Sequence, residues 1–323
     1  MVTLGYYGAN PEGAALTKLR PEAVRLFSES LGLEDKVLIT GASGWFGKTA
    51  IALTKTTGVT YLATGSRPRV IDIDGNKEKV ESHDLDLISA FQPTVVIDAA
   101  FLTRDKVAVI GAGKYIEINQ VLMKISKEIA SLESVRKYVG FSSGATVNLA
   151  GHSSFSLSDN PYAALKKSYE EQMMEVSNWS KASVVIPRVY SVTGAYVNKP
   201  QLFAFSDLIL QARAGVIEVR AKNKVLRRYS PVEDVIALAV AQSKQQGQII
   251  FDTGGEMLEV GDLANQIRME ICQDAIIHRE INPHLLADDY QSDNVQWSNV
   301  LSLSDMEQAP LSEQIRRAAR HLV

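Results

Sequence analysis

Short apolar runs alternate with amphipathic stretches over the middle of the chain. Runs rich in β-branched residues and bounded by turn residues are typical of buried strands, whereas apolar positions three and four residues apart predict helices. The expected strands are Val37–Thr40, Val59–Ala63, Thr94–Asp98, Lys137–Phe141 and Ser183–Ile186. The expected helices are Thr49–Thr54, Asn119–Leu132 and Pro161–Trp179. This alternation predicts an α/β fold, a Rossmann-like doubly wound parallel sheet with helices on both faces.

The pattern changes after Pro187, where turn residues cluster and the elements become shorter. Further elements are expected at Phe203–Ala214, Ile217–Arg220, Val232–Ser243 and Gln248–Phe251, and another helix after Gly254 and Gly255. Leu19–Phe27 is typical of a helix, because Pro21 stands in its first turn. We therefore expect three parts: an extension over residues 1–35, the main α/β part over 36–188, and a smaller α/β part over 189–323.

Composition and charge exclude several classes of protein. The chain has 323 residues, of which 46% are apolar and 22% charged, as in ordinary globular proteins. A net charge of −3 leaves no basic excess for nucleic acid. The one cysteine, Cys272, excludes an internal disulfide framework and fits a reducing compartment, and the five histidines form no metal-ligand spacing with it.

The start of the chain has neither a basic region nor a continuous apolar region of the kind that targeting signals carry. The densest apolar run, Val235–Ala241, is far shorter than the roughly 20 residues that a membrane helix needs. We therefore expect a cytoplasmic protein that binds no membrane, no nucleic acid and no metal.

A glycine loop stands between the first expected strand and the helix that follows. Its three glycines, Gly41, Gly44 and Gly47, have the spacing G-x-x-G-x-x-G. Glycines at such a turn allow close approach of a pyrophosphate, and the helix N-terminus offers backbone N–H groups to it. This context favours a bound dinucleotide over a plain glycine-rich turn.

The end of the second expected strand indicates which dinucleotide is bound. Cofactors without a 2′-phosphate usually meet an Asp or Glu there. This chain instead has Ser66, Arg67 and Arg69, and arginine forks suit a phosphate. NADP is therefore favoured, and NAD remains open.

A tyrosine, a lysine and one of two neighbouring serines could take part in proton transfer. Tyr162 and Lys166 are four residues apart in an expected helix, so they share one face of it. An ammonium one turn away favours the phenolate, which lets a tyrosine exchange a proton with a carbonyl or alcohol near neutral pH. Ser142 and Ser143 follow the strand Lys137–Phe141, at the sheet edge where ligands bind in open α/β folds.

With these residues in place, the chain from Lys36 onward resembles the extended branch of the short-chain dehydrogenase/reductase family, which holds nucleotide-sugar epimerases, dehydratases and ketoreductases. The resemblance rests on the segments Thr40–Gly47, Asp84-Leu85, Asp98–Ala100, Asn119, Phe141–Gly144, Tyr162 with Lys166, Pro187-Arg188, Tyr229–Asp234 and Gln248–Gly255. It implies that Tyr162 is the catalytic acid/base, Lys166 its partner and Ser143 a hydrogen-bonding group for the substrate.

The resemblance also implies which residues bind the cofactor and the substrate. The implied cofactor residues are Gly41, Ser43, Gly44, Trp45, Phe46, Gly47, Ser66, Arg67, Asp84, Leu85, Ala99, Ala100, Asn119, Tyr162, Lys166, Pro187 and Val189. The implied substrate residues are Phe101, Thr103, Ser142, Arg227 and Arg228, with either arginine on a diphosphate. On this basis residues 36–188 would bind the dinucleotide, and residues 189–323 would mainly bind substrate, with some segments returning to the first part. A homodimer is also implied.

The expected function is NAD(P)-dependent hydride transfer on a nucleotide-activated sugar, by an epimerase or a 4-ketoreductase. A 4,6-dehydratase is disfavoured, because Gly144 and Ala145 follow Ser143 where that subgroup has an acid pair. The basic turn at Ser66 and Arg67 leans toward the reductase. The alternatives are an NADPH-dependent reductase of a non-sugar carbonyl and a non-catalytic NAD(P)-binding sensor.

Overall fold

The computed structural model describes residues 18–147, 155–242 and 249–322. The first sixteen residues, for which no targeting signal is expected, lie outside the described residues, as do Ser243 and Gln248 at the ends of two expected elements. No helix within the described ranges is both long enough and apolar enough to cross a membrane.

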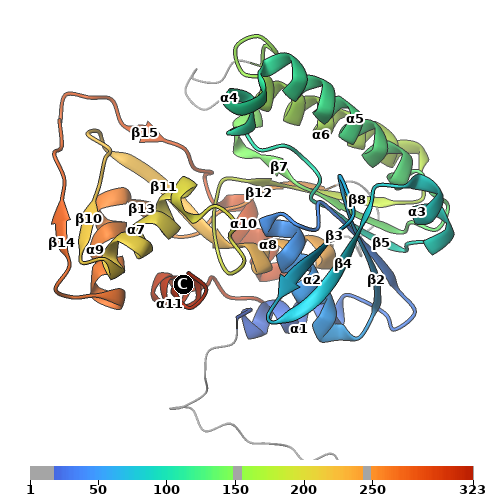
Figure 1. The fold of residues 1–323 in the computed structure, drawn as a ribbon, viewed down its shortest axis with the longest axis horizontal. Helices are drawn as coiled ribbons and strands as arrows, with labels where there is room; N and C mark the ends of the chain where they lie inside the picture. The colour runs from blue at the N-terminus through green and yellow to red at the C-terminus, as the bar shows by residue number, and fades with distance from the viewer. Residues whose placement is uncertain (1–17, 148–154, 243–248, 323) are drawn as a thin grey trace, which may run out of the picture.

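A nine-stranded sheet forms the centre of the molecule, with the order β12-β8-β6-β5-β1-β2-β4-β3 and β7 paired with β8 (Figure 1). All pairs in it are parallel except β3 with β4. The strands are β1 (Lys36–Thr40), β2 (Thr60–Gly65), β3 (Arg69–Ile73), β4 (Asn76–Ser82), β5 (Val95–Asp98), β6 (Lys137–Gly140), β7 (Ser142–Ser143), β8 (Ser183–Val189) and β12 (Ile249–Asp252). The predicted Rossmann-like, doubly wound fold is confirmed.

Helices cover both faces of this sheet (Figure 1). One layer holds α1 (Pro21–Glu29), α2 (Trp45–Thr57) and α8 (Val232–Gln242), and the other holds α3 (Leu85–Phe91), α5 (Ala112–Ala130) and α6 (Pro161–Trp179), with the short α4 (Lys106–Ile110) packed against α5. Along β1, Val37 and Ile39 are buried in the first layer and Leu38 in the second. Successive strand residues face opposite sides, so a run that is apolar at every position marks a strand covered on both faces.

The sheet ends in a β3–β4 hairpin that the apolar pattern does not predict. Its turn residues, Asp74 and Gly75, have φ values of 56° and 81°. Positive φ at both positions is the geometry that suits an Asp-Gly hairpin turn. The two strands carry many charged residues, which is typical of an edge, and this composition hides them from a search for buried runs.

The C-terminal portion forms a second, smaller body of structure beside the sheet, with its own buried cluster around Phe205, Ile217, Leu263 and Ile315 (Figure 1). Its elements are β9 (Ser191–Thr193), α7 (Ala204–Arg213), β10 (Val216–Glu218), β11 (Val225–Pro231), β13 (Met257–Glu259), α9 (Val260–Ile271), β14 (Ile276–His278), β15 (Asp288–Asp289) and α11 (Leu311–Ala319), with a 3-10 turn at Pro200–Leu202. Another 3-10 turn, Gly144–Thr146, follows β7 in the main part. Strand β11 pairs with β9, β13 and β15. Three later elements return to the main sheet: α8 packs on α1 and α2, β12 pairs with β8, and α10 (Val295–Leu303) packs on α8 and β12.

Candidate active site

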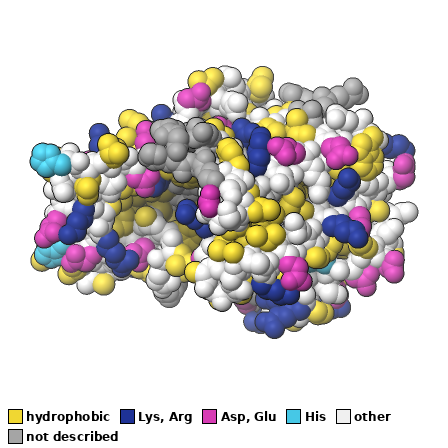
Figure 2. Space-filling view, turned by 90° about the horizontal axis from the view of Figure 1, so that it is seen from above, with side chains coloured by type: hydrophobic (Ala, Val, Ile, Leu, Met, Phe, Trp, Pro, Cys, Tyr) yellow, Lys and Arg dark blue, Asp and Glu magenta, His cyan; other side chains and the backbone are white. Residues whose placement is uncertain are grey.

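A cavity of about 720 Å³ lies where the carboxyl ends of β1, β5, β6 and β8 meet the C-terminal portion. Viewed from above, the molecule has a hollow whose interior shows many hydrophobic side chains (Figure 2). The predicted site residues that line the cavity are Gly44, Trp45, Phe46, Gly47, Ala99, Ala100, Phe101, Thr103, Ser142, Ser143, Tyr162, Lys166, Val189 and Arg227. The topology therefore brings most of the predicted catalytic and substrate residues to one place.

The glycine loop is packed too tightly for side chains at two of its three glycines. Gly41 has a φ of +60°, and a Cβ there would lie 2.4 Å from the carbonyl oxygen of Ala99. A Cβ on Gly47 would lie 2.4 Å from the carbonyl oxygen of Gly41. Gly44 is the N-cap residue of α2 and has no side chain to cap the helix, so this end of the helix keeps backbone donors for an anionic ligand.

Lys166 is buried on α6, one turn beyond Tyr162, which also faces the cavity. Its ammonium donates to the carbonyl oxygen of Phe141 at 2.7 Å and lies 3.7 Å from the ring centroid of Phe101. Burial lowers the pKa of Lys166 to about 7, against the opposing charges of Asp98 and Glu170. Lys166 is therefore partly neutral at pH 7.

Burial raises the pKa of Tyr162, although a hydrogen bond with Ser143 and the positive charge of Arg104 oppose this shift. The phenol is thus protonated at neutral pH in this arrangement. A protonated phenol can donate a proton to a substrate oxygen, which is the direction that a carbonyl reduction needs.

Ser143 lies between two tyrosines. Besides its contact with Tyr162, its Oγ is 3.2 Å from the hydroxyl of Tyr290, and it accepts from the N–H of Ala145 at 3.2 Å. Tyr290 belongs to the C-terminal portion and packs against Tyr190, with ring centroids 5.1 Å apart. Sequence reasoning missed Tyr290, because no local motif marks a residue that reaches the site from 147 positions away.

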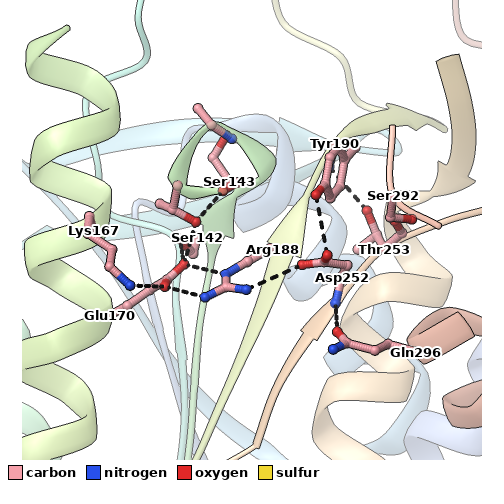
Figure 3. Close-up of polar contacts among 12 residues, drawn as sticks. Ser142, Ser143, Lys167, Glu170, Arg188, Tyr190, Asp252, Thr253, Ser292 and Gln296 are labelled. Carbon is pink, nitrogen blue, oxygen red and sulfur yellow. Dashed lines mark hydrogen bonds and ion pairs between the residues drawn. The ribbon is translucent and has the colours of Figure 1, made fainter. Parts of the chain in front are cut away.

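Ser142 has a different set of partners, in a polar network between α6 and β8 (Figure 3). Its hydroxyl donates to Glu170 at 2.6 Å, and Arg188 holds the same carboxylate through two bonds of 2.8 Å. Despite burial, these hydrogen bonds hold the pKa of Glu170 below its usual value. The Ser142 proton is therefore engaged within the protein, whereas Ser143 contacts Tyr162 and Tyr290.

The network continues from Arg188 to β12 and the C-terminal portion (Figure 3). Arg188 lies 3.7 Å from Asp252, and the hydroxyl of Tyr190 donates to Asp252 at 3.3 Å. Gln296 accepts a hydrogen bond from the backbone N–H of Asp252 at 2.7 Å. One set of polar contacts therefore joins the segment Ser142–Ser143 to Tyr190, the residue that packs against Tyr290.

Other predicted cofactor residues do not line this cavity: Gly41, Ser43, Ser66, Arg67, Asp84, Leu85, Asn119 and Pro187. Ser66 and Arg67 form an exposed turn after β2. The carboxylate of Asp84 caps α3 by accepting from the N–H groups of Asp86 and Leu87. The buried Asn119 accepts from the N–H of Leu102 at 2.8 Å and so supports the loop after β5.

The two candidate diphosphate ligands, Arg227 and Arg228, are neighbours on β11 with different surroundings. Arg227 lines the cavity, but its guanidinium is paired with Asp288 at 2.7 Å and lies 5.6 Å from the ring centroid of Tyr290. Arg228 donates to the carbonyl oxygens of Gly255 and Ser292 and does not line the cavity. Because successive strand residues point in opposite directions, only Arg227 can meet a ligand here.

The residues present fit a dinucleotide: a glycine loop that only a Cβ-free backbone can form, an uncapped helix start, and a cavity that continues to the Tyr–Lys pair. Within the described ranges, no group of three or more His, Cys, Asp or Glu side chains could hold a metal ion. Fold and site together define a Rossmann-like α/β protein of the dinucleotide-binding class.

The comparison with known families agrees with this class. Residues 37–253 match the model of the NAD dependent epimerase/dehydratase family, which is more than half of the chain. The chain therefore belongs to that family. Among curated proteins, none matches the chain.

Solved structures of related fold cover nearly the whole chain. An epimerase from Methanothermobacter thermautotrophicus is 19% identical, with a TM-score of 0.67 over 93% of this chain and 95% of that chain. The UDP-glucose 4-epimerase of Thermus thermophilus, in complex with NAD, is 17% identical, with a TM-score of 0.69 over 89% and 98%. The GDP-mannoheptose C4 reductase of Campylobacter jejuni, with NADP bound, is 14% identical, with a TM-score of 0.67 over 90% and 98%. At these identities the likeness shows the fold.

Proposed function

We propose that the protein is an NAD(P)-dependent enzyme that transfers a hydride to or from a nucleotide-activated sugar, as an epimerase or a 4-ketoreductase. The observation that carries the proposal is the convergence of Ser143, Tyr162 and Lys166 on the cavity that begins at the glycine loop. Solved structures of similar fold hold UDP-glucose with NAD in one case and NADP in another, which supports the substrate and cofactor classes. We also expect the protein to be cytoplasmic and to form a homodimer. Light scattering would test the oligomeric state.

In this proposal the bound dinucleotide supplies or accepts the hydride. Tyr162 donates its phenol proton to the substrate oxygen in the reducing direction and removes it in the oxidising direction. Ser143 hydrogen-bonds the same oxygen and stabilises its developing negative charge. The ammonium of Lys166 favours the phenolate form of Tyr162. The protonated state of Tyr162 suits the reducing direction, and the exposed Ser66–Arg67 turn favours NADP.

A turnover screen tests the proposal. The protein is incubated with NADH or NADPH and with UDP-, dTDP- and GDP-linked sugars and their 4-keto forms, and hydride transfer is followed by absorbance. Tyr162→Phe should lower turnover by at least about 10²-fold, since it removes the general acid/base. Tyr61→Phe, which removes a phenol hydroxyl bonded to Glu78 at the hairpin edge, should keep full turnover. Full turnover in Tyr162→Phe would show that the mechanism is wrong.

A second candidate, an NADPH-dependent reductase of a non-sugar carbonyl, is favoured by one observation. Arg227, the arginine that faces the cavity, is already paired with Asp288, so its charge is partly compensated before a diphosphate could bind. Arg227→Glu decides between the two candidates. A nucleotide-sugar enzyme should lose affinity for UDP- or dTDP-type ligands, whereas a reductase of uncharged carbonyls should keep its KM.

A further inference from the structure

A buried carboxylate, Asp98, lies at the end of β5 beside the floor of the cavity. Its side chain is 5% exposed. Five groups donate to its two oxygens: the hydroxyls of Thr40 and Tyr138, the Ser126 hydroxyl at 2.5 Å, the Tyr169 hydroxyl at 3.2 Å and the Ala100 N–H at 3.2 Å. A carboxylate can only accept hydrogen bonds, and these five donors match that capacity of its two oxygens.

All five donors are neutral, and none of the ion pairs among the described residues includes Asp98. Its negative charge is therefore solvated by dipoles and is not cancelled by a cation in contact. A buried charge of this kind is costly to a fold unless another charge in the same interior compensates for it.

The cation that shares this interior is Lys166. It is 6% exposed, and its ammonium lies 5.4 Å from the ring centroid of Tyr169, whose hydroxyl donates to Asp98. The charged groups that act on Lys166 are Asp98 from β5 and Glu170 from its own helix. Tyr162 and Tyr169 are the tyrosines of that helix closest to it along the chain. Of these two anions, Glu170 already accepts hydrogen bonds from Nε and Nη2 of Arg188. Asp98 is the anion left to compensate for Lys166.

We infer that Asp98 is a positioning residue for proton transfer: its fixed negative charge keeps the Lys166 ammonium charged inside the cavity, where Lys166 acts on Tyr162. This inference rests on the proposed function and deepens it. Burial alone would discharge the lysine at neutral pH, and the Asp98 charge is the first of the influences that raise the Lys166 pKa against it. The family resemblance includes Asp98 among its segments but implies no role for its side chain.

The variant Asp98→Asn tests this inference, because the amide keeps the shape of the side chain and the surrounding hydroxyls can turn to accept from it. The charge of Lys166 is followed by NMR of ¹⁵N-labelled lysine, assigned with Lys166→Met. The titration midpoint should fall by roughly one pH unit, the scale of one nearby buried charge. From a starting value of about 7, the charged fraction at pH 7 then drops from about one half to about one tenth.

The same shift predicts the pH profile of turnover. Relative to the wild type, Asp98→Asn should be unimpaired at acidic pH, about fivefold slower at pH 7 and about tenfold slower at alkaline pH, as follows from a roughly one-unit shift. The matched control is Asp35→Asn, which removes a 4% exposed carboxylate just before β1, at the opposite edge of the sheet. It should leave the Lys166 midpoint unchanged. A merely structural role for Asp98 would lower turnover equally at every pH.

An unmoved Lys166 midpoint in Asp98→Asn would overturn the inference, whatever the turnover. The NMR titration needs no substrate, so the two proposals can fail separately. If the midpoint falls while the wild type turns over no sugar nucleotide, the inference on Asp98 stands and the proposed substrate is wrong. If Asp98→Asn does not fold, Asp98→Ser takes its place, since it is also neutral and has a hydroxyl that can accept.

Discussion

The tight packing of the glycine loop predicts whether replacing Gly47 by alanine raises or lowers the stability of the protein. Gly47 is the third residue of α2, and a glycine-to-alanine change in a helix ordinarily stabilises a protein by up to about 1 kcal/mol. Here the new Cβ would lie 2.4 Å from the Gly41 carbonyl oxygen and 2.6 Å from the Ala42 Cα. Both contacts are backbone atoms that cannot move aside alone, and overpacking of this kind costs about 1–3 kcal/mol. Gly47→Ala should therefore be destabilising.

The assay is urea unfolding followed by tryptophan fluorescence, with Gly113→Ala as the matched control. Gly113 is the second residue of α5, and no atom lies within 4 Å of the Cβ that alanine would add. The control should be as stable as the wild type or more stable, whereas the Gly47→Ala midpoint should fall. If Gly47→Ala raised the midpoint as Gly113→Ala does, the tight packing of the loop would be refuted. If the packing holds, Gly47→Ala should also weaken the dinucleotide-induced rise in melting temperature.

Three further predictions concern other parts of the molecule. Tyr290→Phe should lower kcat roughly tenfold with little change in KM, because Ser143 loses a hydrogen-bond partner while the ring still packs. An unchanged kcat in steady-state kinetics would contradict this. Arg67→Glu should weaken NADP binding at least about tenfold and NAD binding far less, as measured by fluorescence titration. An equal loss of affinity for both dinucleotides would show that Arg67 does not bind the 2′-phosphate. Burial raises the pKa of Glu233 from 4.5 to about 7, so between these values the folded protein holds a proton that the unfolded chain has lost. The stability of the wild type should therefore fall as pH rises through this window, and Glu233→Gln should lose this part of the pH dependence. If the urea midpoints of the two proteins changed in the same way from pH 4 to 8, the prediction would be wrong.

The parts of the site that sequence reasoning reached are those with local signals. The strand, glycine loop and helix from Lys36 to Thr57 are contiguous, and each step constrains the next through turn geometry and burial. Tyr162 and Lys166 share a helix face by spacing alone, and helix periodicity is the most reliable short-range pattern. The topology then carries these local pieces to one sheet edge, as the right-handed crossover rule requires.

The parts that were missed depend on contacts between distant segments. Tyr290 reaches Ser143 from the C-terminal portion, and the composition around it, Asp288-Asp289-Tyr290, is that of an ordinary polar loop. Arg227 and Arg228 are equivalent in the sequence, and only the pairing of β11 with β13 and β15 separates the one that faces the cavity. The β3–β4 hairpin could have been found, since Asp74-Gly75 is a strong turn signal, but its charged strands do not follow the apolar pattern.

The electrostatics of the site explain why its chemistry was harder to predict than its location. From the sequence, Lys166 is an ammonium one turn from Tyr162 and should favour the phenolate. In the fold Lys166 is buried and Tyr162 is partly buried, so burial lowers the pKa of Lys166 and raises that of Tyr162. Both shifts oppose the ammonium–phenolate form expected of the pair, although the protonated phenol suits proton donation in the reducing direction. Other charges in the same interior must restore the charge of Lys166, and the Asp98 carboxylate lies there among five neutral hydrogen-bond donors. The competence of the Tyr–Lys pair therefore depends on a residue outside the motif, because motifs specify which groups meet, whereas their charge states follow from burial and from the charges buried with them.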